Sequence, residues 1–246
     1  LIHDDIMDQA PLRRGLPTVH TKFGVNTALL SGDVMLIKAY EYVSRISTKH
    51  QSEVLHLFNQ TAREVCEGQQ LDMDFENRDQ VAIDEYLRMI ELKTSVLLAA
   101  SLQLGSMLGG ATQRNQERLY EFGRKLGLAF QVQDDYLDAF GDPEKFGKQV
   151  GGDILANKKT FLLIHALEVA DPSTKAELMQ LMQENPADKV ARILGVFRKT
   201  GVDAWALELK KRFLNEAMSA LDDIAVLSVR KKPLIDLAHY LIQREH

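Results

Sequence analysis

The sequence has few of the residues that cross-link a chain or interrupt its helices. Cys66 is the single cysteine, so no disulfide can form within the chain, and a lone thiol fits a protein of the reducing cytoplasm. Six prolines among 246 residues leave long stretches free to be helical. Runs in which polar and apolar residues alternate, as in half-buried strands, are almost missing. These deficits predict an all-α protein of the cytoplasm.

Two further absences disfavour membrane and nucleic-acid functions. The most apolar run, residues 96–111, is broken by Ser101 and Ser106 and is shorter than the ~20 residues of a membrane-spanning helix. We therefore expect a buried helix there and no membrane span. The net charge of −5 disfavours nucleic acid as a partner. A charged content of 26% and a hydrophobic content of 45% are ordinary for a globular protein.

Apolar residues recur at helical spacing along most of the chain. The pattern predicts helices over residues 1–9, 21–47, 51–75, 84–109, 116–140 and 158–169. Four or so shorter helices are expected within residues 172–246, with breaks near Pro186, Gly201 and Pro233. In the helix over 21–47, one side is predicted to carry Leu29, Leu30, Val34 and Ile37, followed by Tyr40 or Glu41.

The most informative stretch combines acidic residues with a segment rich in glycine and lysine. Asp134, Asp135 and Asp138 are spaced so that, at ~100° per residue, they share one face of a predicted helix. Three carboxylates this close repel one another, and a divalent cation relieves the repulsion. The lysines that follow are Lys145, Lys148, Lys158 and Lys159. The combination indicates a metal-bridged phosphate site, although a solvated helix face is the commoner reason for such acids.

A second acidic triplet near residue 1 repeats the same spacing. Asp4, Asp5 and Asp8 stand at the intervals that separate the later three aspartates, which weakens the case for a chance arrangement. A loop with prolines and a glycine follows, and it holds Arg13 and Arg14. Guanidinium groups match the geometry of phosphates. The two arginines are therefore either phosphate ligands or counter-ions of the nearby aspartates.

Polar residues also continue the apolar stripes of two predicted helices. The stripe of the helix over 51–75 turns polar at Gln69 and Asp72, which indicates either a helix that enters a polar cavity or a frayed, solvated end. Lys93 stands in line with the apolar residues of the helix over 84–109. Buried lysines are rare unless they are paired. Lys93 therefore either extends its ammonium group to solvent or binds a ligand phosphate.

Taken in order, these motifs resemble those of the trans-isoprenyl diphosphate synthases, which include farnesyl and geranylgeranyl diphosphate synthases. The segment HDDIMDQAPLRRGLPTVH, from His3, is similar to the first aspartate-rich motif of that family with its paired arginines. Residues 67–72, EGQQLD, are similar to its G-Q-x-x-D motif, and Lys93 with Thr94 matches its K-T pair.

The later motifs follow in the same order. Phe130, Gln131 and the triplet from Asp134 resemble the second aspartate-rich motif, and Gly147-Lys148 resembles the glycine and lysine that come after it. Residues 153–160 are similar to D-x-x-x-G-K-x-T, with Asn157 where glycine is usual. The resemblance runs from residue 1 to about residue 165. A Gly-Lys-x-x-Arg stretch that binds isopentenyl diphosphate in the family does not occur in this sequence.

The resemblance implies a fold and a set of ligands. The fold is a single isoprenoid synthase domain over residues 1–246, a large helical bundle around a deep central cavity, here without the family's N-terminal helices. Two aspartate motifs would face each other across the cavity mouth. Three Mg²⁺ ions, which Mn²⁺ can replace, would bridge the substrate diphosphate to Asp4, Asp8 and Asp134. The second-shell or partial ligands would be Asp5, Asp135 and Asp138.

The resemblance also implies a reaction, the head-to-tail condensation of isopentenyl diphosphate with an allylic diphosphate through an allylic carbocation. The backbone carbonyl of Lys93, the hydroxyl of Thr94 and the amide oxygen of Gln131 would stabilise the cation, and Lys158 would assist departure of the diphosphate. The implied substrate-binding residues are Arg13, Arg14, Lys93, Thr94, Phe130, Gln131, Lys148 and Lys158. A homodimer is expected from the resemblance alone.

Two other functions remain as alternatives. A class I terpene cyclase would normally carry one D-D-x-x-D motif and a different second metal site, and the complete triplet at Asp134 disfavours it. A non-catalytic regulatory subunit of a prenyl synthase tends to lose aspartates from one motif, whereas both triplets are intact here. Product chain length is governed in the family by residues that would precede Leu1, so the sequence does not specify it.

Overall fold

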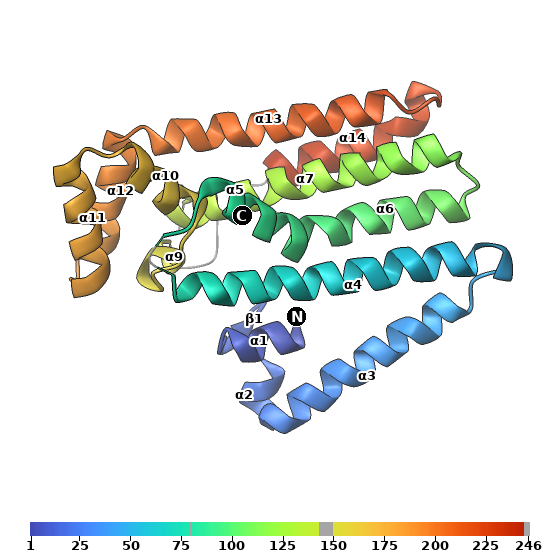
Figure 1. Ribbon diagram of the computed structural model, residues 1–246, viewed down its shortest axis with the longest axis horizontal. Coiled ribbons are helices and arrows are strands. Elements are labelled where there is room, and N and C mark those ends of the chain that lie inside the picture. Colours follow the sequence, from blue (N-terminus) through green and yellow to red (C-terminus); the bar gives the residue numbers. More distant parts are fainter. Residues whose placement is uncertain (79, 143–149, 244–246) are drawn as a thin grey trace. The chain divides into compact units, whose positions relative to one another are not determined.

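The chain is helical apart from connecting loops and one short hairpin, which confirms the all-α prediction (Figure 1). A computed structural model describes residues 1–78, 80–142 and 150–243. The chain divides into two compact units, Leu1–Asn59 and Gln60–His246. No described helix combines the length and the apolar composition of a membrane span.

The first unit contains the earlier aspartate triplet. Its elements are α1 (Ile2–Met7), β1 (Leu12–Arg13), β2 (Leu16–Pro17), α2 (Val19–Phe23), α3 (Val25–Ser44) and the beginning of α4 (Thr48–Glu76). The strands β1 and β2 pair antiparallel around Arg14 and Gly15, whose φ angles are 53° and 77°. Positive φ at both central residues is the pattern of a type I′ hairpin turn. The sequence analysis predicted a loop here and missed the hairpin.

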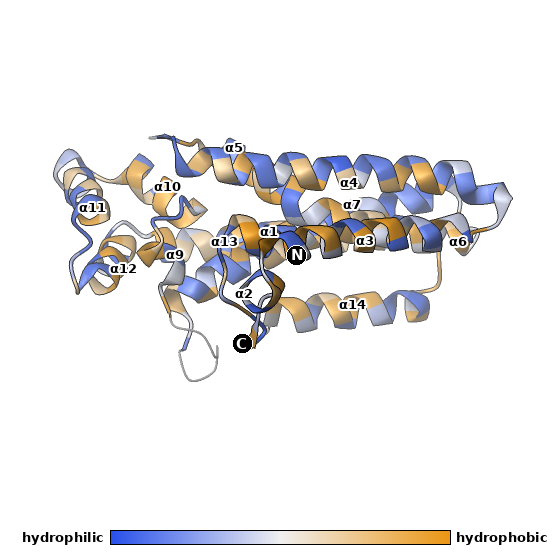
Figure 2. Ribbon diagram, turned by 90° about the horizontal axis from the view of Figure 1, so that it is seen from below, coloured by the Kyte–Doolittle hydropathy of each residue, from blue (hydrophilic) through white to orange (hydrophobic). Residues whose placement is uncertain are grey.

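The predicted continuous helix over 21–47 is wrong at one point. Gly24 has φ 88° and separates α2 from α3, a backbone conformation that glycine adopts without a steric penalty. The apolar side of this helix is exposed, because Leu30 is 66% exposed and Ile37 is 58% exposed. Ala28 is the buried residue of α3, which is coloured hydrophobic over most of its length in Figure 2.

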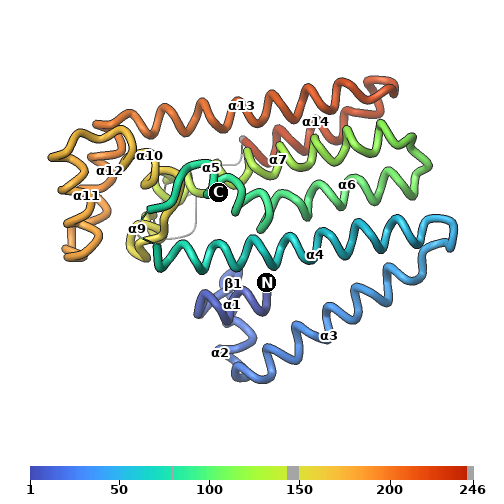
Figure 3. Tube along the Cα trace, viewed as in Figure 1, coloured from blue at the N-terminus to red at the C-terminus, as the bar shows by residue number. Residues whose placement is uncertain are grey.

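The second unit is built around one long helix. After the later part of α4, its elements are α5 (Ile83–Ile90), a π-helical turn η1 (Glu91–Ser95), α6 (Val96–Leu108), α7 (Gln113–Phe140), α9 (Gly152–Leu155), α10 (Phe161–Val169), α11 (Pro172–Glu184), α12 (Lys189–Lys199), α13 (Val202–Asp222) and α14 (Ser228–Gln243). Helix α7 packs against η1 and α6, and also against α13, as the trace in Figure 3 shows.

The hydrophobic core explains why α7 occupies this place. Phe122 and Leu126 of α7 are fully buried, and Leu137 is 7% exposed. Helix α10 adds Phe161 and Leu162, which are also buried, and its colour in Figure 2 is hydrophobic along nearly the whole helix. Burying such side chains stabilises the fold by about 1.5–3 kcal/mol each. The same helix α7 therefore anchors the core and carries the second aspartate triplet.

Glycines let three helical segments approach closely around the π-helical turn. A Cβ atom at Gly127 of α7 would lie 2.7 Å from the Ser95 Cα atom. One at Gly68 of α4 would lie 2.3 Å from the backbone nitrogen of Lys93. A Cβ at Gly123 would likewise lie 2.7 Å from the Ala99 Cα atom. Contacts this short are possible only because these positions have no side chain. They fix the backbone of η1 between α4 and α7.

The later helices agree with the sequence analysis at two of three breaks. The chain leaves α11 just before Pro186, and Gly201 precedes α13 with φ 73°, as predicted. The break predicted near Pro233 is wrong, because Pro233 lies inside α14. It removes a single backbone hydrogen bond within the first two turns, which α14 tolerates. The actual interruption covers residues 223–227.

The close contact at Gly127 leads to a stability prediction. Gly127→Ala should lower the free energy of unfolding by about 1–3 kcal/mol, because the new methyl group overlaps Ser95. Gly105→Ala on α6 is the matched control, since its new methyl group enters open space, and it should be neutral or stabilising by up to about 1 kcal/mol. Urea unfolding followed by circular dichroism measures both. Equal stability of the two variants would contradict the close-packing account.

Candidate functional site

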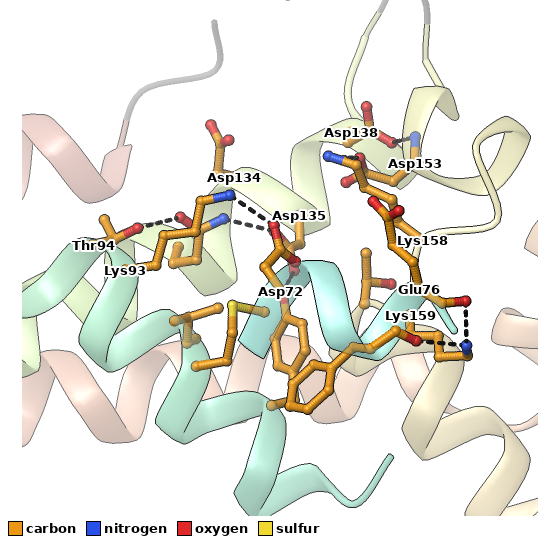
Figure 4. Close-up of a pocket in the computed structure, with 16 residues that line it drawn as sticks. Asp72, Glu76, Lys93, Thr94, Asp134, Asp135, Asp138, Asp153, Lys158 and Lys159 are labelled. Carbon is orange, nitrogen blue, oxygen red and sulfur yellow. Dashed lines mark hydrogen bonds and ion pairs between the residues drawn. The ribbon is translucent and has the colours of Figure 1, made fainter. Parts of the chain in front are cut away.

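A polar cavity of about 250 Å³ lies in the second unit. Its walls come from the end of α4, from α5 and η1, from α7, and from α9 with the segment that follows it (Figure 4). The charged residues around it are Asp72, Glu76, Lys93, Asp134, Asp135, Asp138, Asp153, Lys158 and Lys159. Six carboxylates and three ammonium groups around one small cavity favour a ligand that combines cations with an anion.

Seven of the residues proposed from the sequence line this cavity. They are Lys93, Thr94, Gln131, Asp134, Asp135, Asp138 and Lys158. Phe130 is partly buried and packs against the hydrophobic core instead. Lys145, Gly147 and Lys148 lie outside the described residues. Asp4, Asp5, Asp8, Arg13 and Arg14 belong to the first unit.

The π-helical turn places Lys93 and Thr94 on the cavity wall. The Val96 N–H donates to the Glu91 carbonyl oxygen, five residues back, and this wider turn interrupts the α-helical pattern. Such turns occur often at functional sites. The Thr94 hydroxyl donates to Gln131 Oε1 at 3.4 Å, so two of the proposed cation-stabilising groups are in contact. The sequence predicted one regular helix over 84–109 and gave no sign of the π turn.

Lys93 is paired with an acid that the sequence analysis did not assign to the site. Its Nζ atom lies 2.7 Å from Asp72 Oδ2, and both side chains are partly buried. The polar end of α4 therefore enters a cavity, which is one of the two interpretations offered for Asp72. Lys159 donates to the Phe75 carbonyl oxygen at 2.7 Å and closes the C-terminal end of the same helix.

Asp135 is the most buried carboxylate of the cavity, at 6% exposure. Its Oδ2 atom accepts a hydrogen bond from the Tyr86 hydroxyl, and its Oδ1 atom accepts one from Gln131 Nε2 at 2.9 Å. Burial, with a further contribution from the charge of Asp153, raises the pKa of Asp135 to about 8, against the lowering effect of the two hydrogen bonds. A buried tyrosine hydroxyl generally needs a partner, and Asp135 provides one for Tyr86.

Asp138 and Asp153 are two neighbouring carboxylates of the cavity, and in Figure 4 they lie at the end away from Lys93 and Thr94. Asp138 Oδ2 accepts the backbone N–H of Asp153 at 3.0 Å. Burial and the charge of Asp138 raise the pKa of Asp153 to about 6, although the Lys158 ammonium, 3.7 Å away, acts in the opposite direction. Asp153 was visible from sequence only as a letter of a motif and was not assigned to the site.

The donor set fits a hard divalent cation. Asp134 and Asp138 are half-buried carboxylates on one helix face, with both of them on the cavity wall. Among the described residues, no three acidic, histidine or cysteine side chains converge into a closed metal cluster. Mg²⁺ is usually bound through one or two carboxylates together with substrate phosphates, so such a closed cluster is not required.

In the first unit, the arginine loop folds back on the aspartates. Arg13 Nε lies 2.8 Å from Asp5 Oδ1, and Arg13 Nη2 lies 3.3 Å from Asp4 Oδ2. The hydrogen bond that Arg13 donates to the Asp5 carboxylate is the main reason that the pKa of Arg13 is raised. Asp5 is 4% exposed, whereas Asp8 and Arg14 are exposed. For Arg13, the structure contains the ion pair that the sequence analysis offered as an alternative to a phosphate contact.

Comparison with known proteins decides the family. A sequence model described as polyprenyl synthetase matches residues 1–197 of the 246. The chain belongs to the polyprenyl synthetase family. The short-chain isoprenyl diphosphate synthase of Methanocaldococcus jannaschii is 46% identical over 183 residues, which cover 74% of this chain and 56% of that relative.

Solved structures of the family confirm the fold. Geranylgeranyl pyrophosphate synthetase from Pyrococcus horikoshii superposes with a TM-score of 0.93 at 37% identity, over 99% of this chain and 75% of that one. The polyprenyl synthase of Caulobacter crescentus, solved in complex with calcium and isoprenyl diphosphate, has a TM-score of 0.87 at 29% identity over 100% of this chain and 74% of that one. The predicted isoprenoid synthase fold is therefore correct.

The environment of Asp135 leads to a prediction about pH. Its folded pKa of about 8 exceeds the ordinary 3.8, so the folded protein holds a proton that the unfolded chain releases between these values. Stability from this group is complete below pH 3.8 and is lost as the pH rises to about 8. Relative to Asp135→Asn, the wild type should lose up to about 1.4 kcal/mol per pH unit in that window.

Urea unfolding at a series of pH values, in EDTA, measures this difference. The Asn variant is the matched control, because it keeps the shape of the side chain and cannot ionise. Parallel pH profiles for the two proteins would show that Asp135 ionises normally and that its burial has no electrostatic consequence.

Proposed function

We propose that the protein is a trans-prenyltransferase. It condenses isopentenyl diphosphate head-to-tail with an allylic diphosphate and releases a longer all-trans prenyl diphosphate and inorganic diphosphate. The observation that carries the proposal is the cavity of aspartates and lysines, which lies within the segment that the family matches. The names of the relatives and the isoprenyl diphosphate complex of the Caulobacter crescentus protein support it.

When bound, divalent cations, with Mg²⁺ as the expected one, would supply positive charge that stabilises the departing diphosphate. We assign Asp134 and Asp138 as their carboxylate ligands in the second unit, because both are half-buried on the cavity wall. Asp135 has a different role, since its two oxygens already accept hydrogen bonds from Tyr86 and Gln131. It orients Gln131. Asp4 and Asp8 are proposed to bind the same class of cation, and Asp5 to orient Arg13.

The lysines and the neutral polar groups complete the proposed mechanism. Lys93 and Lys158 place fixed positive charges on the cavity wall, where they stabilise the charge that develops on the leaving diphosphate. Thr94 and Gln131 present oxygen atoms that stabilise the allylic cation. The double bond of isopentenyl diphosphate then attacks the cation, and the departing diphosphate accepts the proton that is lost.

Several finer expectations stay predictions. They are a single domain over residues 1–246, three Mg²⁺ ions with Mn²⁺ as a substitute, a homodimer, and a location in the cytoplasm. The substrate contacts of Arg13, Arg14, Phe130 and Lys148 belong with them. The terpene cyclase and regulatory-subunit alternatives gain no support, because the relatives are named as synthases and both aspartate triplets are intact.

The direct test offers the natural full-length protein labelled isopentenyl diphosphate with the five-, ten- and fifteen-carbon allylic diphosphates in turn. We expect Mg²⁺-dependent labelled products, abolished by EDTA and restored by added Mg²⁺. The size of the extracted products then gives the chain length. If no primer supports incorporation, the protein is not a prenyltransferase.

Asp134→Asn tests the metal assignment within the same assay. We expect kcat to fall by about 10²–10³, as when one group that stabilises developing charge is removed. Asp236→Asn on α14 is the control, because Asp236 is exposed and does not line the cavity. Unchanged turnover in Asp134→Asn, with thermal stability like that of the control, would remove Asp134 from the metal site.

A further inference from the structure

Lys189 is buried without a carboxylate partner among the described residues. It begins α12, and its side chain is 1% exposed. Its Nζ atom donates to Asn157 Oδ1 at 2.5 Å and to Asn185 Oδ1 at 2.7 Å. Lysine is almost never buried unless an acid accompanies it. Two neutral amides in place of an acid indicate that this contact is retained for its geometry.

Both asparagines occupy a backbone conformation that side chains rarely adopt. Asn157 has φ 54° and Asn185 has φ 46°. Glycine adopts such angles most easily, but it has no amide oxygen, whereas asparagine tolerates the angle and accepts a hydrogen bond. This double requirement explains why Asn157 stands where the family pattern usually has glycine. Lys189 needs the oxygen, and the turn needs a positive φ.

The turn at Asn157 presents Lys158 to the cavity. The Asn157 N–H donates to the Ile154 carbonyl oxygen at 3.2 Å, and the Lys158 N–H donates to the Asp153 carbonyl oxygen at 2.9 Å. On its other side, the Asn157 side chain is held by Lys189 of α12. The contact between Asn157 and Lys189 therefore fixes the turn that carries Lys158, and with it the segment that includes Asp153, to the beginning of α12.

A second contact ties the beginning of the same segment to α12. Gly151, with φ 82°, precedes α9, and a Cβ atom there would lie 2.6 Å from Val190 Cγ1. Val190 is the neighbour of Lys189, so the first turn of α12 supports α9 at both ends. The short helix has four residues and buries none of them, so its position depends on these contacts with α12 and on the hydrogen bonds that Gly151 N–H and Asp153 N–H donate to Asp138 of α7.

We propose that Lys189 and Asn157 position Lys158 for the substrate diphosphate. Lys189 does not touch the substrate; it acts through the turn. The inference rests on the proposed function, because it assigns Lys158 to the diphosphate. It also implies that glycine at position 157 cannot replace Asn157 in this chain, because glycine adopts the backbone angle but offers Lys189 no side-chain oxygen.

Two matched variants separate positioning from stability. Asn157→Gly and Asn185→Gly each keep the backbone angle accessible and each remove one acceptor from the same ammonium group. Both should lower the thermal stability to a similar extent. Asn157→Gly alone should raise KM for the allylic diphosphate by about tenfold, the order seen when a supporting residue of a ligand is removed. Asn185→Gly should leave KM within about twofold of wild type.

Two double variants complete the test. Asn157→Gly combined with Lys189→Met should recover thermal stability, because the buried ammonium group is gone. KM for the allylic diphosphate should stay raised, because the turn at position 157 still has no contact with the side chain at position 189. Asn157→Gly in a Lys158→Ala background should not change KM further, since Lys158 is the group through which Asn157 acts. Equal KM effects for the two single glycine variants, or an undiminished effect without Lys158, would overturn the inference.

The affinity for inorganic diphosphate in Mg²⁺, measured by calorimetry on the same variants, distinguishes the two claims. If the wild type makes no prenyl product, the proposed function fails. Calorimetry still reports whether Asn157→Gly weakens diphosphate binding about tenfold while Asn185→Gly does not. If the wild type turns over normally and both variants bind diphosphate equally well, the positioning inference alone is wrong.

Discussion

The burial of several carboxylates beside one another, which removes their hydration and adds mutual repulsion, is the constraint on which the cavity depends. Asp135 and Asp153 are buried near one another, and their pKa values are raised to about 8 and about 6. The chain compensates this repulsion only in part, through hydrogen bonds from Tyr86 and Gln131 and through the pairing of Lys93 with Asp72. Under the proposed function, a divalent cation with a bound diphosphate would supply the remaining compensation, and the relief of this electrostatic cost would favour their binding.

The scaffold holds these charges in place by close helix packing. Gly68 and Gly127 allow α4 and α7 to contact the backbone of the π-helical turn, so that Lys93 and Thr94 project from a segment with little freedom to move. On the opposite side, α12 supports the segment of Asp153 and Lys158 through Lys189 and Val190. Charge stabilisation of a leaving group is most effective when the charges need no rearrangement during reaction.

The sequence predicted the structure correctly where one local pattern determines which way a side chain faces. The spacing of Asp134, Asp135 and Asp138 predicted that they share one helix face, and all three line the cavity, because helical periodicity alone sets which residues share a face. The polar end of α4 left a cavity or a solvated end open for Asp72, and the structure shows Asp72 on the cavity wall. In contrast, the π turn at Lys93 depends on glycines from two other helices, and no pattern within residues 84–109 encodes it. The Tyr86–Asp135 contact joins residues 49 positions apart and was missed for the same reason.

Other errors arose where a single residue admits two conformations. Gly24 ends a helix, whereas Pro233 does not, although both residues disfavour helix interiors. Asn157 was read as a minor departure from a glycine pattern, yet its amide has a specific partner in Lys189, which is 32 residues away.

The most direct measurement of the central claim is the binding of inorganic diphosphate with and without Mg²⁺, by calorimetry at constant pH. The account predicts that diphosphate binds measurably only when Mg²⁺ is present and that Asp134→Asn removes this dependence together with most of the affinity. Diphosphate binding of equal strength in EDTA would contradict it, because the lysines alone would then hold the anion and the carboxylates would have no part in the site.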